Sequence, residues 1–417
     1  MRRKIGRDSI ILALVLALFA AFSLGFVIVH DTRQIKNRET TSRVTISWWG
    51  SDSRTEYMLK ALKAYEKADA GVSVTPYYSM SQGYSDRFDM LMKADQEADV
   101  MLIDDEMLEK YNNAFLTLDN CKDLDLSSYE QSELTTGMVD GKLKAVPLTW
   151  NMMTFAYNND ILYSLDMKIP ETWDDLIADG RLMQRSSRHL LAMDEESAFF
   201  MIYAYSVQKE GQEWFDTQGH YTGSEEQLKD ALSFYQTLLD NGVLAENDSL
   251  DSFTSQQAAG TAAWADEIKD ACTPLMHTRH NVRLGRLLSF DGNLSGWYHK
   301  PGCLYAIKAD TEHKDESISL INYLIHDKDA IQNQGIDKGI PVNQETVAVL
   351  GKRGLVSGII LSSDNPTLTD ADTLADLNPA LKNTDAAKLF FNAYRTYGSS
   401  DASASFLQNA YSEKYPQ

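Results

Sequence analysis

VTISWWGSDSRTEYMLKALKAYEKA, residues 44–68, reads as one strand followed by one helix. The run 44–48 is short and rich in β-branched residues, as strands are. The turn at 50–53 then offers three side chains that can cap a helix. After it, apolar residues recur at helical spacing and form one stripe: Met58, Leu59, Leu62 and Tyr65. The folded part of the chain is therefore predicted to open with a β-α unit.

Two tryptophans, Trp48 and Trp49, lie where this strand ends and its helix begins. In open α/β sheets, ligands bind outside the carboxyl ends of the strands. Aromatic rings at such a position either cover the core or offer a face on which a ligand can stack. Because neighbouring residues of a strand point to opposite faces, at least one of the two rings is hard to bury.

The following residues continue the alternation of strand and helix. Residues 72–78 form a second predicted strand, a helix is expected to begin near Tyr84, and the all-apolar run 100–103 is typical of a central parallel strand. Strand, helix, strand, helix, strand is a doubly wound α/β pattern. The sequence contains neither GxGxxG nor GxxxxGK followed by Ser or Thr, which argues against a nucleotide-binding protein.

Further motifs follow in order along the chain: DVMLID at 99–104, KAVPL at 144–148, FAYNNDIL at 155–162, IPETWDDL at 169–176, LYAI at 304–307 and KGIPVN at 338–343. Together with the opening unit, they resemble family 1 extracellular solute-binding proteins, the sugar-capturing receptors of bacterial ABC importers. The resemblance spans residues 44 to 343, although Ala98 stands where the family usually has proline.

The resemblance implies an α/β fold with two lobes, of the type II periplasmic-binding-protein kind, joined by hinge crossovers near 147–153, 296–303 and 340–345. It assigns two segments to the first lobe, 44–149 and 300–342, and two to the second lobe, 150–299 and 343–417. Such lobes close over a ligand by a hinge motion. The implied partners are a saccharide and the permease subunits of an importer, and we expect the protein to be a monomer.

The first 43 residues are expected to be an anchor or signal and a tether. Four basic residues precede the run 10–29, which is 20 residues long and carries no charge. That length spans a bilayer core as a helix, whereas the apolar part of a cleaved signal is usually about 7–15 residues. The basic end would stay in the cytoplasm, which places the body on the outer face of the cytoplasmic membrane. A cleaved, secreted form is the alternative.

Charge and cysteine content exclude several classes of function. The net charge is −21, and residues 1–43 are basic, so the rest of the chain is more acidic still. Such a body repels phosphate backbones, which argues against nucleic acid. The three cysteines match neither a zinc site nor a CxxC pair, and they read as buried thiols, with one disulfide left open. His277 and His280 lack further ligands at metal spacing, so we expect no metal and no cofactor.

Sugar binding requires flat aromatic faces for the C–H groups of the ring and polar groups for its hydroxyls. Aromatic candidates at strand ends and crossovers are Trp48, Trp49, Trp150, Trp264 and Trp297. Phe391 is added by the resemblance, since relatives turn this face of the last helix towards the ligand. Polar candidates are Arg54, Asp104, Asn151, Glu195 and Asp266. Each tryptophan, and Phe391, could instead belong to the core, and Arg54 could pair on the surface with an acidic residue near the helix start.

We therefore predict a receptor that performs no chemistry on its ligand. The sequence contains neither GxSxG nor HExxH. The acidic clusters at 104–106 and 195–196 keep a glycan-cleaving enzyme open as an alternative, because such enzymes need two carboxylates beside the scissile bond. A second alternative is an extracytoplasmic sugar sensor that feeds a membrane kinase, because it would share the same fold.

Overall fold

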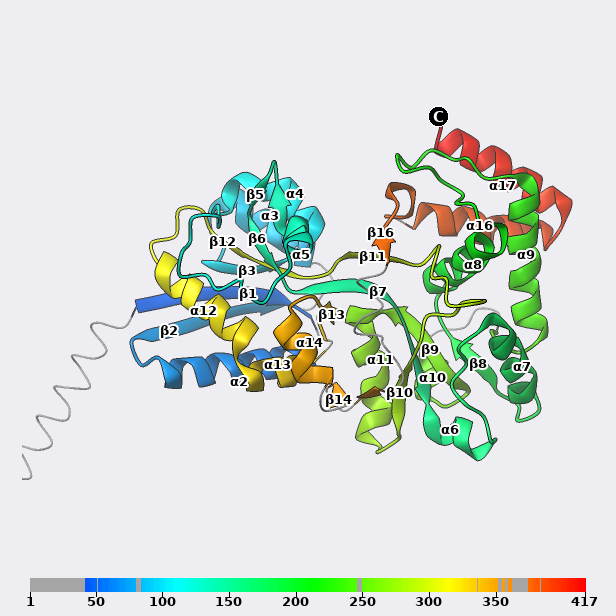
Figure 1. The fold of residues 1–417 in the computed structure, drawn as a ribbon, viewed down its shortest axis with the longest axis horizontal. Helices are drawn as coiled ribbons and strands as arrows, with labels where there is room; N and C mark the ends of the chain where they lie inside the picture. The colour runs from blue at the N-terminus through cyan, green and yellow to red at the C-terminus, as the bar shows by residue number, and fades with distance from the viewer. Residues whose placement is uncertain are drawn as a thin grey trace, which may run out of the picture.

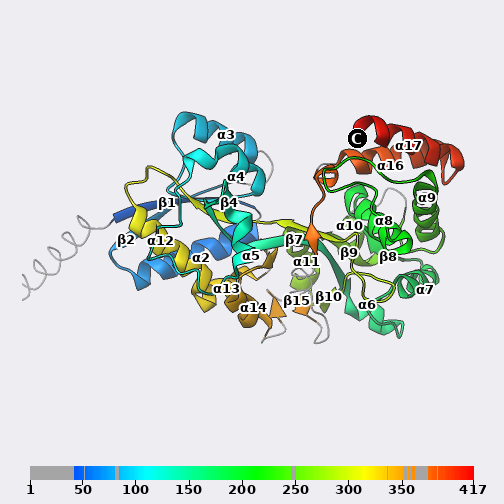
Figure 2. The same ribbon diagram turned by 45° about the horizontal axis from the view of Figure 1, so that its top comes forward.

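The computed structural model describes residues 42–50, 52–79, 84–245, 250–335, 337–351, 355–356, 359–361, 374–382 and 384–417. These residues form two lobes that lie side by side and are joined in the middle by extended strands (Figures 1 and 2). Each lobe is built on its own β-sheet with helices packed on it. The expected two-lobed α/β fold is confirmed.

The sheet of the first lobe has the strand order β2-β1-β3-β12-β6. Its strands are β1 (Ser42–Trp49), β2 (Val72–Ser79), β3 (Val100–Ile103), β6 (Ala145–Pro147) and β12 (Leu304–Ile307). Strands β2, β1 and β3 run parallel, and β12 is antiparallel to both β3 and β6. The helices of this lobe include α2 (Asp52–Ala68), α3 (Tyr84–Ala94), α4 (Asp105–Tyr111), α12 (Lys314–His326) and α13 (Lys328–Gln334). The predicted opening β-α unit and doubly wound pattern are both present.

The sheet of the second lobe is organised around the long strand β7 (Thr149–Asn158), every residue of which is buried. Its other strands are β8 (His189–Ala192), β9 (Ala258–Trp264), β10 (Val282–Gly285), β11 (Tyr298–Pro301), β13 (Ile340–Pro341), β14 (Leu355–Val356), β15 (Ile359–Leu361) and β16 (Ala375–Asp376). The helices around it include α6 (Asn159–Ser164), α7 (Trp173–Gln184), α8 (Glu195–Glu210), α9 (Glu225–Asp240), α11 (Ala265–His277), α16 (Asp385–Tyr397) and α17 (Asp401–Lys414).

The chain passes between the two sheets along extended segments. Strand β6 leads into β7 through Leu148 alone, and β11 leads back into β12 through two residues. A third passage follows α13, where β13 pairs with the start of β7. Helix α14 (Gln344–Gly351) follows β13 and packs against α12 and α13.

Two further predictions from the sequence concern the membrane anchor and the cysteines. The predicted anchor at 10–29 lies outside the described residues, and the helices that are described include none long and apolar enough to cross a membrane. Cys121, Cys272 and Cys303 are all buried free thiols, which is how the sequence analysis read them.

Candidate binding site between the lobes

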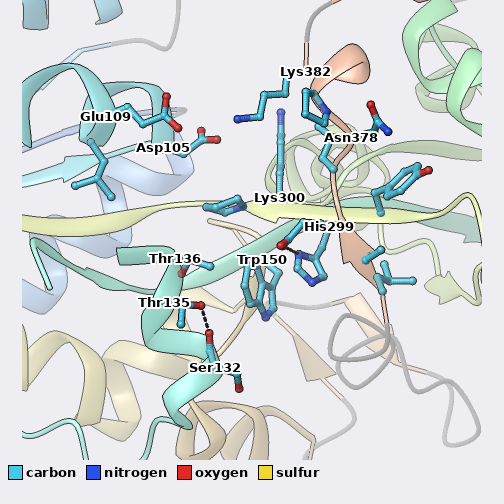
Figure 3. A pocket seen from close by; sticks show the side chains of 18 of the residues that line it. Asp105, Glu109, Ser132, Thr135, Thr136, Trp150, His299, Lys300, Asn378 and Lys382 are labelled. Carbon is cyan, nitrogen blue, oxygen red and sulfur yellow. Dashed lines mark hydrogen bonds and ion pairs between the residues drawn. The ribbon is translucent and has the colours of Figure 1, made fainter. Parts of the chain in front are cut away.

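A cleft with a volume of about 1290 Å³ lies between the lobes. Its first-lobe wall comprises α4, α5 (Gln131–Leu134) and the segment that follows α5 up to Val139. Its second-lobe wall comprises parts of 213–217, β11 and the segment 374–382. Figure 3 shows side chains from both walls directed into this space.

The walls of the cleft carry different charges. Asp105, Glu106 and Glu109 line it from α4 in the first lobe. Lys300 from β11 and Lys382 from the second lobe line the other side (Figure 3). The first-lobe wall therefore offers carboxylate acceptors, whereas the second-lobe wall combines these ammonium donors with the carboxylates of Glu213 and Asp376.

The crossover strands β7 and β11 present two different faces. Lys300 pairs with Asn151, and directly paired residues of antiparallel strands lie on the same face. Trp150 pairs with Pro301 and points to the opposite face, where its ring lies 4.0 Å from that of His299. One face of the crossover is thus aromatic and the other polar.

Trp264, the last residue of β9, is held in a fixed orientation. Its Nε1 donates a hydrogen bond to Glu196 Oε1 at 3.2 Å, and its ring meets Phe200 edge-on, with centroids 5.1 Å apart. The Nζ atom of Lys300 lies 4.4 Å from the centroid of the Trp264 ring. Contacts with Glu196 and Phe200 of α8 thus fix the Trp264 side chain, and the ammonium group of Lys300 covers one face of its ring.

Asn151 and Asp266 bond to each other across two elements of the second lobe. Asn151 Nδ2 donates to Asp266 Oδ1 at 2.8 Å, and the Asp266 backbone N–H donates to Asn151 Oδ1 at 3.4 Å. Because Asp266 lies in the first turn of α11, this pair fixes that helix end beside the crossover. Both residues were predicted from the sequence to be near a ligand, and they lie together.

Asp104 follows β3 and begins α4. Its Oδ1 accepts a hydrogen bond from the Met107 backbone N–H at 2.8 Å, so it is the N-cap of this helix. Burial raises the pKa of Asp104, and the charges of Asp105 and Glu106 add to the rise, while Lys300 opposes it. The charge of Lys300 therefore reaches a carboxylate of the first lobe.

Glu267 faces the same lysine from the second lobe. The side chain of Glu267 is exposed at the first turn of α11. Partial desolvation raises its pKa to about 7, helped by the charges of Asp266, Asp194 and Glu196, and Lys300 opposes this shift too. Lys300 is thus the centre of a group that includes four predicted residues: Asp104, Asn151, Trp264 and Asp266.

Lys300 itself was missed by the sequence analysis. Nothing in its local sequence, Tyr-His-Lys-Pro at 298–301, distinguishes it from a lysine on an exposed strand. The only available signal was its place in an expected crossover, because the partners that define its role lie far away along the chain.

Arg54 is part of a buried network rather than free for a ligand. Its Nε donates to Asp337 Oδ2 at 2.8 Å, and its Nη1 donates to the Trp49 carbonyl oxygen at 2.8 Å. Asp337 also lies 3.4 Å from Lys269 Nζ of α11, so the network joins a first-lobe helix to a second-lobe helix. Gly50 has a φ of 137°, and a Cβ there would lie 2.6 Å from Arg54 Cδ, which explains the glycine. The surface pairing with an acidic residue near the helix start is not what the structure shows: the partner is the distant Asp337, and the pair is buried.

The neighbouring tryptophans of β1 have separate environments. Trp48 is fully buried and stacks on Tyr78, with centroids 5.2 Å apart, so it belongs to the core. Trp49 is partly exposed and lies 4.9 Å from the ring of Tyr84. Their opposite directions follow from the alternation of a strand, as expected, and only Trp49 is placed to meet a ligand.

Trp297 is a core residue in this structure. Its Nε1 donates to the Leu288 carbonyl oxygen at 2.9 Å, and its ring stacks on Trp173, with centroids 6.1 Å apart and planes 11° apart. Only 2% of its surface is exposed. The expectation that this crossover tryptophan faces the cleft therefore fails, because its ring turns into the second lobe.

Glu195 and Phe391 line a second, smaller cavity of about 390 Å³ within the second lobe, which Lys300 does not line. Glu195 forms a salt bridge with Arg395 of α16, and Phe391 is buried against Tyr235. This cavity lies among α8, α9 and α16. The structure thus divides the predicted polar and aromatic residues between two places.

Comparison with known proteins gives one family. A family model described as "Bacterial extracellular solute-binding protein" matches residues 60–353. Solved structures that share the fold include the following three. A periplasmic solute-binding protein of Pectobacterium atrosepticum is 23% identical, with a TM-score of 0.71, and the match covers 89% of this chain and 98% of that one.

The second is a periplasmic oligogalacturonide-binding protein of Yersinia enterocolitica in complex with saturated digalacturonic acid, at 23% identity and TM-score 0.70, covering 89% of this chain and 98% of that one. The third is the GacH receptor of Streptomyces glaucescens, solved without ligand and with acarbose, at 15% identity and TM-score 0.67, covering 90% and 98%. At these identities the likeness establishes the shared fold.

Proposed function

The chain belongs to the family of bacterial extracellular solute-binding proteins, and we propose that it captures a saccharide outside the cell for an ABC importer. Proteins of the same fold have been solved with saturated digalacturonic acid and with acarbose, which supports a carbohydrate ligand here. The ligand would bind between the lobes and then be handed to the permease subunits. The protein would bind its ligand without chemical change.

The observation that carries this proposal is the interlobe cleft together with the adjoining group around Lys300, the residue of that group that lines the cleft. Trp264 offers an aromatic face for the C–H groups of a pyranose ring. Asp104 from the first lobe and the Asn151–Asp266 pair from the second offer acceptors and donors for hydroxyl groups. A ligand that touches all of these would hold the two lobes together.

We assign the remaining candidates by their exposure and by the cavity that each one lines. Trp49 and Trp150 are proposed as additional ligand contacts, because Trp49 is partly exposed and Trp150 lines the cleft. Arg54 is proposed to position Trp49 through its hydrogen bond to the Trp49 carbonyl oxygen. Glu195 and Phe391 are proposed to contact only a ligand long enough to reach the second cavity.

The setting of the protein in the cell is part of the same proposal. Residues 10–29 would anchor it on the outer face of the cytoplasmic membrane, and one monomer would serve one importer. The lobes would be divided as 44–149 with 300–342, and 150–299 with 343–417. Sequencing the N-terminus of the protein purified from membranes tests the anchor, since a start between residues 20 and 35 would contradict it.

The test of function is calorimetric titration of the full chain, in detergent, with a panel of mono- and oligosaccharides. For a saccharide that binds, Trp264→Ala should weaken affinity about 10- to 150-fold, the loss expected for removing one buried aromatic contact. Tyr163→Ala is the control, because this tyrosine is 82% exposed on α6. The proposal fails if no saccharide binds, or if Trp264→Ala binds as tightly as the parent.

A further inference from the structure

The face of Trp264 that a sugar ring would need is already occupied in this structure. Lys300 places its Nζ atom 4.4 Å from the ring centroid, within the range of a cation–π interaction. The indole cannot turn away, because Glu196 holds its Nε1 and Phe200 meets its edge. The protein thus supplies a cation of its own to this aromatic face.

Three carboxylates around this point accept hydrogen bonds only from neutral donors within the part of the chain that is described, so Lys300 is the cation that offsets their charge. Asp194 accepts from the Ser197 backbone N–H at the start of α8, Glu196 accepts from the Trp264 indole, and Asp266 accepts from the Asn151 amide. Each of these donors is neutral, so these hydrogen bonds do not neutralise the three negative charges.

Glu267 adds a fourth carboxylate without a hydrogen-bond or salt-bridge partner among the described residues. Its pKa is raised to about 7, first by desolvation and then by the charges of Asp266, Asp194 and Glu196. Lys300 is the cation that counteracts this rise, and it acts on Asp104 in the same direction. One ammonium group therefore serves acidic groups of both lobes.

A ligand ring can stack on Trp264 only after Lys300 has left it. The side chain of Lys300 also lines the large cleft, where Asp105, Glu106 and Glu109 of α4 can receive its ammonium group. Its departure would leave the carboxylates around Glu267 without their cation. A neutral ligand would not replace that charge, and an anionic ligand would add to the repulsion.

We propose that the ligand is an amine-bearing saccharide whose ammonium group takes the place of the Lys300 ammonium over the Trp264 ring and pairs with Glu267. This inference rests on the proposed function and names the class of ligand. Cationic groups are recognised in the same way by aromatic rings with nearby carboxylates. The displaced Lys300 would turn to the acidic wall of the first lobe, which couples ligand entry to contact between the lobes.

Three trimers that differ mainly in charge test the class of ligand by calorimetry with the full chain: glucosamine, N-acetylglucosamine and galacturonic acid trimers. The glucosamine trimer should bind about tenfold more tightly than its N-acetylated form, the size expected for one desolvated cation–π contact, and the galacturonate trimer should bind most weakly. Equal or tighter binding of the neutral or the acidic trimer would overturn the inference while leaving saccharide capture in place.

Variants test the place of the ammonium group. Glu267→Gln should remove most of the preference for the glucosamine trimer, whereas Glu210→Gln, an exposed residue at the far end of α8, should leave it unchanged. Lys300→Met should strengthen binding of the glucosamine trimer, because the internal competitor is gone. Weaker binding to Lys300→Met, or an unchanged preference in Glu267→Gln, would contradict the proposed geometry.

A measurement without any sugar tests the cation site over Trp264 independently of which saccharide binds. In Lys300→Ala the cation site over Trp264 is empty, so methylammonium chloride should raise its melting temperature relative to sodium chloride at equal concentration. The parent, which fills the site itself, should show no such difference, and neither should Lys300→Ala combined with Glu267→Gln. If methylammonium and sodium act alike on Lys300→Ala, no cation site exists at this place and the inference is wrong.

Discussion

Lys338 carries an ionisable group into the interior beside the passages between the lobes. Its side chain is fully buried, and its Nζ atom donates to the Tyr305 hydroxyl at 2.6 Å and to the Met58 sulfur at 3.7 Å. Desolvation lowers the pKa of Lys338 to about 7, and the charge of Asp337 offsets only part of that effect. The amine can remain buried when it is neutral. When it takes up a proton, the folded protein becomes less stable.

Lys338→Met should therefore change how stability depends on pH. In the unfolded chain the lysine pKa is near its ordinary value of 10.5, so above about 7 the unfolded state binds more protons than the folded state. The contribution of Lys338 to stability thus rises with pH from about 7 to 10.5 and is least favourable below 7. Urea unfolding at pH 6 and pH 9 should show that the unfolding free energy of the parent increases relative to that of Lys338→Met as pH rises. Lys122→Met, at an exposed position, is the control, and the same slope in both variants would contradict the assignment.

Trp297→Ala tests the corrected role of this tryptophan. Removing a large aromatic side chain from a core costs about 3–5 kcal/mol of unfolding free energy. Affinity for a bound saccharide should not change, because the ring faces Trp173 and not the cleft. Chemical unfolding and calorimetry of the same preparation measure both quantities. A large loss of affinity with little loss of stability would return Trp297 to the binding site.

Residue roles were predictable from the sequence only where they depend on neighbours in the chain. The opposite directions of Trp48 and Trp49 follow from strand geometry alone. Trp264 and Trp297 could not be told apart, since each lies next to a predicted strand or crossover. What separates them is distant: Trp173 and the Leu288 carbonyl enclose one, and Glu196 and Lys300 frame the other.

Asp104 has two roles at helix α4: it caps the helix, and its charge acts on Lys300. The helix has seven residues, and its first turn holds Asp105 and Glu106 near the positive end of its dipole. Asp104 caps its backbone and at the same time presents a charge to Lys300. The position of α4 at the wall of the cleft depends on this cap.

A pair of variants separates the two roles of Asp104. Asp104→Ala should lower the unfolding free energy by about 0.5–2 kcal/mol, the usual cost of losing an N-cap, while Asp104→Asn should keep the cap and most of the stability. Both should weaken binding of a saccharide, because both remove the charge. Melting curves and titrations of the two variants test this. Equal losses of stability in both would mean that the charge, and not the cap, holds α4.

At the level of elements the sequence was a good guide. Apolar periodicity predicted the opening strand and helix, and the buried run 100–103 is β3 as expected. The Asp that precedes α4 stands where a cap is expected, although only the ligand role was inferred for it. Sheet membership was different, since β12 lies between β3 and β6 despite following them by most of the second lobe. The resemblance to a family assigned 300–342 to the first lobe, but neither it nor the spacing placed β12 between β3 and β6.

The two lobes are linked by more than the passages of the chain. Asp337 receives Arg54 from α2 and lies 3.4 Å from Lys269 of α11, and all three side chains are buried. Burial raises the pKa of Asp337, but the charges of Arg54 and Lys269 hold it below its ordinary value. The lobes are therefore connected by an ionic network beside the hinge strands.

We expect ligand binding to bring the lobes together. A ligand that touches Asp104 in the first lobe and Trp264 in the second gains both contacts only in a closed form, so it shifts the population towards closure. Small-angle scattering should give a smaller radius of gyration with a saccharide that binds, and Trp264→Ala should need more of that saccharide for the same change. A radius that stays the same at saturation would contradict closure.

The place of β12 also sets the order in which the chain can fold. The sheet of the first lobe contains a strand that is synthesised only after the central strands of the second lobe. Until residue 304 has emerged, β3 and β6 have unpaired edges, and such edges invite pairing with other chains. In the second lobe, strands β7, β8, β9 and β10 pair with one another and need no strand from the residues before 149. The second lobe waits in turn for β16 at 375–376, so neither sheet is complete until late in synthesis, which favours a chain kept unfolded until its synthesis or export is nearly complete.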